Sequence, residues 1–106
     1  MTKTLVGAFC LVFAASAPAL AGDADAGKKK SQTCVACHGP DGNSPAPDFP
    51  KIAGQHYDYL LKALKDNKSG ARKNPIMAPL VANLTQRDIE DLAAFYSSQR
   101  GLVIKY

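Results

Sequence analysis

The sequence predicts an all-helical protein with one small domain. The chain has 106 residues, and beyond the first twenty or so it holds almost no alternating, β-branched run of the kind that forms strands. Apolar residues instead recur at three- and four-residue intervals in two long segments, which is the spacing of one helix face. Stretches dense in glycine and proline lie between the helical segments and predict loops.

Residues 1–21 have the organisation of an export signal. Lys3 supplies the positive start, residues 5–15 form an apolar run, and residues 19–21 offer a small-residue cleavage pattern. The apolar run is shorter than the roughly 20 residues that cross a membrane, so a retained anchor is the weaker interpretation. We expect residues 1–21 to be cleaved and residues 22–106 to form a single periplasmic domain without stable membrane insertion.

The first helix is expected from about Asp25 to Cys37. Either Asp23 or Asp25 suits its N-terminal cap, because a carboxylate accepts free backbone N–H groups and is favoured at the positive end of the helix dipole. The last turn of this helix would carry Cys34 and Cys37.

The second helix is expected to begin near Gly54 or Gln55 and to stop by Gly70. Its apolar residues recur at i, i+3, i+4 and i+7, so one face is buried. These residues are Tyr57, Leu60, Leu61 and Leu64.

The third helix has the best-marked start. Residues 85–88 (Thr-Gln-Arg-Asp) resemble a capping box with Asp in place of the usual Glu, and Leu84 can pack against Ile89 across it. Gly101 marks the expected end. The apolar stripe of this helix consists of Ile89, Leu92, Ala93 and Tyr96, widened by Phe95.

Residues 34–38 read Cys-Val-Ala-Cys-His, a C-x-x-C-H motif, which is the attachment signature of a covalently bound c-type haem. Each of the two thiols can add to one vinyl group of the haem, while the adjacent imidazole reaches the iron. A haem also serves as the centre of the core in a domain this small, where an apolar core of side chains alone is marginal.

Three other interpretations of the motif are weaker. A thioredoxin-like dithiol site would lie at a strand-to-helix turn, and no sheet is expected here. Zinc could recruit Cys34, Cys37, His38 and His56, but His38 directly follows Cys37, which is unlike the usual ligand spacing of structural sites. A non-haem thiol or interaction module, with a coincidental motif, would show a mass without added haem.

A second iron ligand is expected in the loops at residues 39–50 or 74–79. Met77 is the only methionine beyond the signal, and it lies on a proline-braced apolar loop. A thioether is a soft, neutral donor that raises the reduction potential relative to a second imidazole. His56 is the less favoured ligand because it is expected to be exposed at a helix start, and an open five-coordinate iron is the third alternative.

Five segments of the chain match a known family: CVACHGPDGN (34–43), FPKIAGQH (49–56), KSG (68–70), NPIM (74–77) and DIEDLAAFY (88–96). Together they resemble a class I c-type cytochrome, and within that class one domain of the bacterial cytochrome c-four type. The resemblance covers essentially the whole of residues 22–106. It implies a small class I cytochrome c fold, in which three main helices and their loops pack around one covalently attached haem. Cytochromes of the c-four type usually hold two such domains in tandem, whereas no second C-x-x-C-H follows here.

By this resemblance, Cys34 and Cys37 form the thioethers of haem c, and His38 and Met77 are the axial iron ligands. Pro50 matches a family position whose backbone carbonyl accepts a hydrogen bond from the ring of the ligating histidine, which fixes the ring and increases its donor strength.

The resemblance also implies a close crossing of the first and last helices. The family pairs a small residue on the first helix with an aromatic residue on the last, which would place Gly27 near Phe95 or Tyr96.

The charge of the expected mature chain is modest. Loss of Lys3 from the 13 basic residues leaves 12 basic against 9 acidic side chains, a formal charge of +3, which is too weak and dispersed to indicate nucleic-acid binding. The basic clusters are either solvated helix faces or a docking surface for acidic redox partners. They comprise Lys28, Lys29 and Lys30, and then Lys62, Lys65, Lys68, Arg72 and Lys73.

The function implied by the resemblance is that of an electron carrier, not an enzyme, working between membrane or periplasmic redox proteins. Two alternatives stay open. One is a haem protein with a labile sixth ligand that binds small gases or reacts with peroxide. The other is a small haem subunit of a larger redox enzyme.

Overall fold

A computed structural model of the chain describes Gly7 and residues 22–103. The expected export signal at residues 1–21 therefore lies outside the described residues, apart from Gly7. Within the described part of the chain every regular element is a helix, which confirms the predicted all-helical class.

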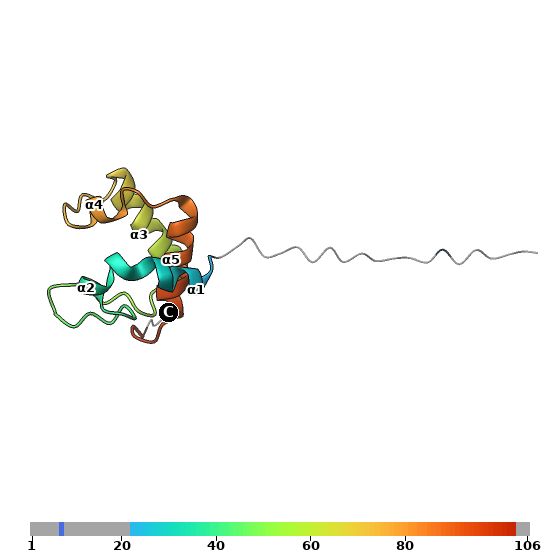
Figure 1. Ribbon diagram of the computed structural model, residues 1–106, viewed down its shortest axis with the longest axis horizontal. Coiled ribbons are helices and arrows are strands. Elements are labelled where there is room, and N and C mark those ends of the chain that lie inside the picture. The colour runs from blue at the N-terminus through green and yellow to red at the C-terminus, as the bar shows by residue number, and fades with distance from the viewer. Residues whose placement is uncertain (1–6, 8–21, 104–106) are drawn as a thin grey trace, which may run out of the picture.

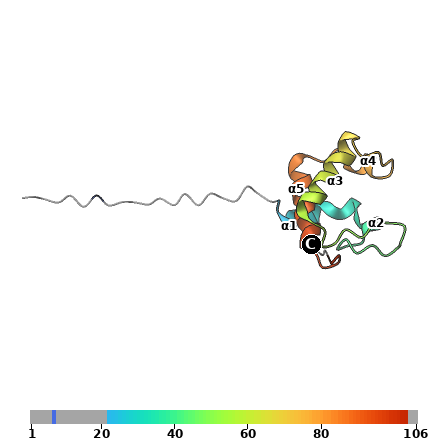
Figure 2. The same ribbon diagram turned by 180° about the vertical axis from the view of Figure 1, so that it is seen from behind.

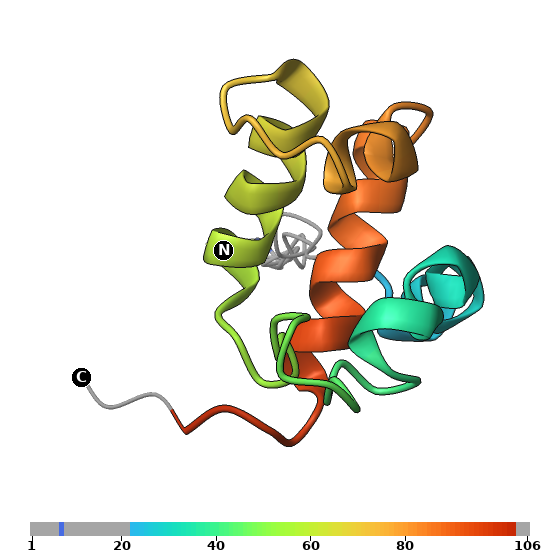
Figure 3. The ribbon, with the colours of Figure 1, turned by 90° about the vertical axis from the view of Figure 1, so that its left-hand side faces the viewer.

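Two long helices form the frame of the domain. Helices α3 (Tyr57–Ser69) and α5 (Gln86–Ser98) lie side by side and run in opposite directions (Figure 3), while α1 (Ala24–Lys30) packs against α5 (Figure 1). The short helices α2 (Val35–His38) and α4 (Met77–Val81) both lie at the same side of this frame, as the reverse view in Figure 2 also shows.

The N-terminal helical segment is interrupted, which differs from the single helix expected over residues 25–37. A short 3₁₀ turn, η1 (Ser31–Thr33), separates α1 from α2. The Ser31 hydroxyl donates a hydrogen bond of 2.7 Å to the carbonyl of Lys28. A serine hydroxyl that donates to a helix carbonyl competes with the backbone N–H groups for that acceptor. The regular α-helical hydrogen bonding is interrupted there, and the chain forms a tighter 3₁₀ turn.

The expected cap of the first helix is confirmed at Asp23. Its side chain accepts hydrogen bonds from the backbone N–H groups of Asp25 and Ala26, at 2.9 Å and 3.3 Å. These bonds satisfy two of the donors that a helix N-terminus leaves free.

The capping box of α5 is also confirmed. Thr85 Oγ1 accepts from the Asp88 backbone N–H at 3.1 Å, and Asp88 Oδ2 accepts from the Thr85 backbone N–H at 2.9 Å. The helix ends before the extended Gln99, however, and not at Gly101. Gly101 is required for another reason, because a Cβ there would lie 2.6 Å from the Cβ of Ala53.

Helix α4 was not expected from the sequence, which suggested a loop around Met77. Met77 is its first residue, and Pro79 is its third. A proline is tolerated there because the first backbone N–H groups of a helix have no partner within it. The Asn74 side chain completes this start, since its Oδ1 accepts from the backbone N–H groups of Ile76 and Met77 at 3.0 Å and 3.1 Å.

The first and last helices cross closely at Gly27, as expected. A Cβ at this position would lie 2.0 Å from the carbonyl oxygen of Asp91 and 2.7 Å from the Cβ of Phe95. No side chain larger than hydrogen fits between the two backbones. The crossing adjoins the apolar core of Leu60, Leu92, Ala93, Phe95 and Tyr96.

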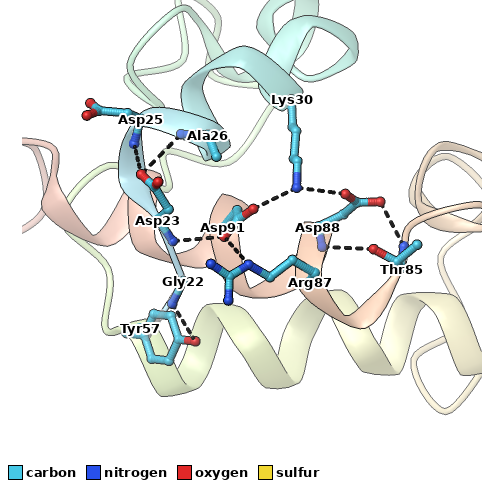
Figure 4. A network of polar contacts seen from close by, with 10 residues as sticks. All are labelled: Gly22, Asp23, Asp25, Ala26, Lys30, Tyr57, Thr85, Arg87, Asp88 and Asp91. Atoms are coloured by element: carbon cyan, nitrogen blue, oxygen red, sulfur yellow. Dashed lines mark hydrogen bonds and ion pairs between the residues drawn. The ribbon is translucent and has the colours of Figure 1, made fainter. Parts of the chain in front are cut away.

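A polar network fastens the N-terminal helix to α5 (Figure 4). Asp91 is only 2% exposed, and it pairs with Lys30 at 2.6 Å and with Arg87 at 3.2 Å, while accepting the Asp23 backbone N–H at 2.8 Å. Burial by itself would raise the pKa of Asp91, but these hydrogen bonds and charges hold that pKa below its ordinary value. Lys30 also pairs with Asp88 at 2.9 Å.

Candidate functional site

Helix α2 gathers three of the residues that the motif singled out. Cys34 is the residue before its first turn, and Cys37 and His38 lie within it. Both thiols are free and half-buried, and His38 is 8% exposed. Gly39 ends the helix with a positive φ of 79°, a conformation that favours glycine.

The His38 ring is held by the backbone of the following loop. Its Nδ1 lies 2.8 Å from the carbonyl oxygen of Pro50. A carbonyl can only accept, so Nδ1 carries the hydrogen and donates it, and the lone pair of the neutral ring resides on Nε2. The hydrogen bond expected between these two residues is therefore present, and it leaves Nε2 free to bind a metal.

Two adjoining cavities, of about 200 Å³ and 240 Å³, lie between α2, α3, the segment before α4, and α5. We call them the first and second cavity. Both are lined mainly by apolar surface. They share a common wall formed by Cys34, His38, Pro50, Leu64, Asn74, Met77 and Leu92.

The two cavities differ at their outer ends. The first has a polar rim with two cations, formed by Lys51, Gln55, Tyr59 and Arg72. The second has no cation in its lining. The residues that line it alone are Thr33, Cys37, Asp48, Phe49, Ile76, Leu80, Val81 and Leu84, most of which are apolar. A ligand attached at the cysteines and filling both cavities would thus meet positive charge in the first cavity and mainly apolar side chains in the second.

Met77 and His56, the two candidates for a second iron ligand, are placed very differently. Met77 is half-buried and lines both cavities together with His38. His56 is exposed beside the start of α3 and lines neither cavity. The arrangement brings Met77 and His38 to one site and leaves His56 away from it.

Two buried polar groups in the first cavity were missed by the sequence reasoning. The Tyr96 hydroxyl and Asn67 Oδ1 have no hydrogen-bond partner among the described residues. Burial, followed by the nearby charge of Cys34, raises the pKa of Tyr96. Asn67 follows Leu60 by seven residues and Leu64 by three, so it lies on the same face of α3 as the apolar stripe. The presence of a polar residue on this apolar face was the sequence signal that could have identified it.

Within 22–103, no three or more His, Cys, Asp and Glu side chains gather in a metal-binding arrangement. None of the helices in this range combines the length and the apolar character that a membrane crossing needs.

Comparison with known proteins agrees with this geometry. Residues 24–99 match the model of the family described as cytochrome c. The chain belongs to the cytochrome c family. It is 47% identical to cytochrome c4 of Pseudomonas aeruginosa over 100 residues, which cover 94% of this chain and 50% of that protein. It is 48% identical over 82 residues to cytochrome c-554(548) of Halomonas halodenitrificans, covering 74% of this chain and 99% of that one.

The fold is shared with a solved cytochrome. The crystal structure of reduced recombinant cytochrome c4 from Pseudomonas stutzeri superposes with a TM-score of 0.74 at 51% identity, covering 78% of this chain and 48% of the other. The chain thus spans about half the length of the cytochromes c4 that it matches. These likenesses confirm the class I cytochrome c fold and the resemblance to one c4 domain.

Family membership also confirms the expected cofactor, covalently attached haem c. The residues fit this cofactor. The second cavity is bordered by the two free thiols, by the His38 ring and by the Met77 thioether. The His38 Nδ1 is already hydrogen-bonded, so Nε2 is the nitrogen that can bind iron. Cations at the first cavity suit the carboxylates of a haem. The Tyr96 hydroxyl and Asn67 Oδ1 are buried there with no hydrogen-bond partner among the described residues, which leaves room for a further polar group.

Proposed function

We propose that this chain is a single-haem electron carrier, with His38 and Met77 as the axial ligands of its iron. The observation that carries the proposal is that His38 and Met77 both line the second cavity together with the two thiols, and that they line the first cavity together with Cys34. Bound haem c supplies a one-electron couple at its iron. Two protein ligands that stay in place in both oxidation states limit the rearrangement that accompanies electron transfer.

Each residue of the site has a distinct task in this proposal. Cys34 and Cys37 would hold the haem through two thioethers, because each S–H bond can add across one vinyl group with no atom lost. His38 binds through Nε2, and the Pro50 carbonyl, as acceptor from Nδ1–H, orients the ring and strengthens it as a donor. Met77 is held from its backbone by the Asn74 side chain.

The partners in this proposal are redox proteins, one as donor and one as acceptor. Ile76 and Leu80 at the second cavity are 63% and 42% exposed, which makes them suitable for a brief apolar contact with another protein. Several of the clustered lysines have partners within the chain. Lys30 and Lys62 form ion pairs, and Lys68 donates to the carbonyl of Leu84, so the basic clusters are partly internal contacts.

The proposal places the working protein in the periplasm, after removal of residues 1–21. Its support is the signal-like organisation of these residues in the sequence. The test is N-terminal sequencing and mass measurement of the chain recovered from a periplasmic fraction. A chain that begins at Gly22 and carries the mass of one haem is expected. Retention of residues 1–21, or a mass without haem, would contradict this part.

The ligand assignment is tested by optical spectra of the oxidised and reduced protein. Ferric haem with bound methionine sulfur has a weak near-infrared band, which is expected in the unaltered chain. Met77→Ala should abolish this band, whereas the neighbouring exposed Ile76→Ala should keep it. Haem without the band in the unaltered chain would instead favour a labile sixth site, with gas binding or peroxide chemistry.

A further inference from the structure

Tyr96 carries a buried hydroxyl group that the proposed function does not use. The residue belongs to α5, lines the first cavity and is only 3% exposed. Its hydroxyl has no hydrogen-bond partner among the described residues. Buried polar groups in folded proteins are nearly always hydrogen-bonded, so this hydroxyl requires a partner that its neighbours do not supply in their present positions.

The Tyr96 ring is closely packed, which fixes the position of the hydroxyl. The centre of the ring lies 4.9 Å from that of the Phe95 ring. Gly42 also lies against it, because a Cβ there would be 2.9 Å from Cδ1 of Tyr96. The oxygen lies on the axis about which the ring flips, so a flip does not move it. A partner must therefore approach the hydroxyl, since the hydroxyl cannot move to a partner.

Two side chains of the N-terminal helical segment adjoin this hydroxyl, namely Ser31 and Cys34. Burial raises the pKa of Tyr96, the charge of Cys34 raises that pKa further, and Ser31 acts in the opposite direction. Ser31 is held by its own hydrogen bond of 2.7 Å to the Lys28 carbonyl, in a position where it is not a partner of Tyr96. Cys34 packs against the core that contains Tyr96 and lines the first cavity with it.

A thioether at Cys34 changes both the position and the hydrogen bonding of its sulfur. A free thiol can donate or accept, whereas a thioether sulfur has no hydrogen and can only accept. Thr33 Oγ1, at 3.9 Å, is an exposed polar neighbour of this sulfur, and Tyr96 carries the buried one. We infer that, in the haem-loaded protein, the Tyr96 hydroxyl donates a hydrogen bond to the Cys34 sulfur. This inference rests on the proposed thioether at Cys34.

Tyr96 is therefore a positioning residue, which acts on the cofactor through a cysteine. The hydrogen bond restricts rotation about the bonds of the Cys34 thioether, and so fastens one edge of the bound haem to α5. Cys37 lines the second cavity but not the first, where Tyr96 lies. The two thioethers thus differ, because the Tyr96 hydroxyl holds only the one at Cys34.

The test is the variant Tyr96→Phe, which removes the hydroxyl and keeps the ring. We expect the folding equilibrium constant of the haem-loaded protein to fall by roughly threefold to tenfold, because a buried hydrogen bond is lost. Resonance Raman spectra should show a shifted C–S stretching band for one thioether. A hydroxyl without a partner would give the opposite result, since its removal relieves a desolvation cost. An equal or larger equilibrium constant in Tyr96→Phe would overturn the inference.

A double-mutant cycle identifies the partner of the hydroxyl. In the haem-loaded Cys34→Ala protein, where Cys37 alone attaches the cofactor, Tyr96→Phe should no longer lower the folding equilibrium constant. A second cycle pairs Tyr96→Phe with Ser31→Ala. Coupling of Tyr96 to Ser31 and not to Cys34 would overturn the inference. The Raman shift decides the question if Cys34→Ala does not retain haem.

Tyr57→Phe is the matched control. Tyr57 packs against the same core and lines neither cavity, and its hydroxyl accepts the Gly22 N–H at 3.4 Å. Its loss should leave both C–S bands unchanged, and equal spectral changes in Tyr57→Phe and Tyr96→Phe would contradict the role of Tyr96.

The optical spectrum of the haem in alkaline pyridine separates the two proposals, because it distinguishes attachment by one thioether from attachment by two. Two thioethers in the unaltered protein, with no effect of Tyr96→Phe, would leave the proposed attachment at Cys34 standing and the role of Tyr96 wrong. A single thioether or none would contradict the proposed attachment itself, and the role of Tyr96 with it.

Discussion

At the residue scale, Asp91 concentrates several stabilising contacts in one carboxylate. It is a buried charge that receives donors from two side chains and from the backbone at the start of α1. Removing one partner of a buried ion pair is costly because the remaining groups lose their hydrogen bonds without regaining full hydration. Arg87 lies only four residues before Asp91 on α5, whereas Lys30 and the Asp23 backbone N–H are distant along the chain, and the sequence contained no sign of these two partners.

We expect Asp91→Ala to lower the free energy of unfolding by about 3 kcal/mol, because the Asp23 N–H and the two cations lose a buried acceptor. Urea unfolding of the haem-loaded protein measures this value. Lys62→Ala is the matched control, since Lys62 is 74% exposed in its pair with Asp66. It should change stability by less than about 0.5 kcal/mol. Similar losses in both variants would contradict the role of burial.

Asp88 predicts a specific dependence of stability on pH. The hydrogen bond from the Thr85 backbone, followed by that from Lys30, lowers the pKa of Asp88 from 3.8 to about 2. A pKa lowered by folding contributes stability that is complete above pH 3.8 and is lost as the pH falls through about 2. The contribution amounts to about 2 kcal/mol.

The measurement is urea unfolding of the unaltered chain and of Asp88→Asn at several pH values between 5 and 2. The difference in stability between the two should shrink by about 2 kcal/mol over this range, because the variant has no carboxylate to protonate. A difference that stays constant with pH would exclude Asp88 as the titrating group.

At the scale of elements, the crossing of α1 and α5 depends on the missing side chain of Gly27. We expect Gly27→Ala to destabilise the haem-loaded protein by about 3 kcal/mol, because the added carbon would overlap the Asp91 carbonyl and the helices must separate. Thermal unfolding is the measurement. Gly70→Ala is a control in open space, and its positive φ should cost only about 1 kcal/mol. A smaller loss at Gly27 than at Gly70 would contradict the close crossing.

The elements also show where sequence reasoning succeeded and where it did not. The Thr85–Asp88 capping box and the Asp23 cap were predicted because each depends on residues only a few positions apart. The break at Ser31 and the short helix at Met77 were not predicted. Helices of one turn depend on a few local hydrogen bonds, such as those of Asn74 with the next residues, and carry no periodic pattern.

At the scale of the whole molecule, the cavity pair occupies the place where a domain of this size would otherwise have its core. The helices that surround it, α3 and α5, turn apolar side chains such as Leu64 and Leu92 toward this space. A domain this small has little apolar burial to spare, so the haem is expected to be part of the fold as well as the redox group.

We therefore expect Cys34→Ala combined with Cys37→Ala, which prevents covalent attachment, to leave the chain largely unfolded. Circular dichroism should show much less helix than in the haem-loaded protein, and no cooperative thermal transition. Cys34→Ala alone, which keeps one thioether, serves as the intermediate comparison. A helical, cooperatively unfolding chain without haem would contradict this expectation.

The sequence by itself determined the all-helical class, the two long amphipathic helices and the residues of the C-x-x-C-H motif. All of these follow from local spacing and from chemistry between neighbours in the chain. The sequence favoured Met77 over His56, but only the tertiary structure placed Met77 in a cavity with His38. It alone also decided that Lys30 pairs with Asp91 and that Asn67 Oδ1 is buried with no hydrogen-bond partner among the described residues. These outcomes depend on which distant segments of the chain come together. The packing of the helices determines that, and the spacing of apolar residues along the sequence does not encode it.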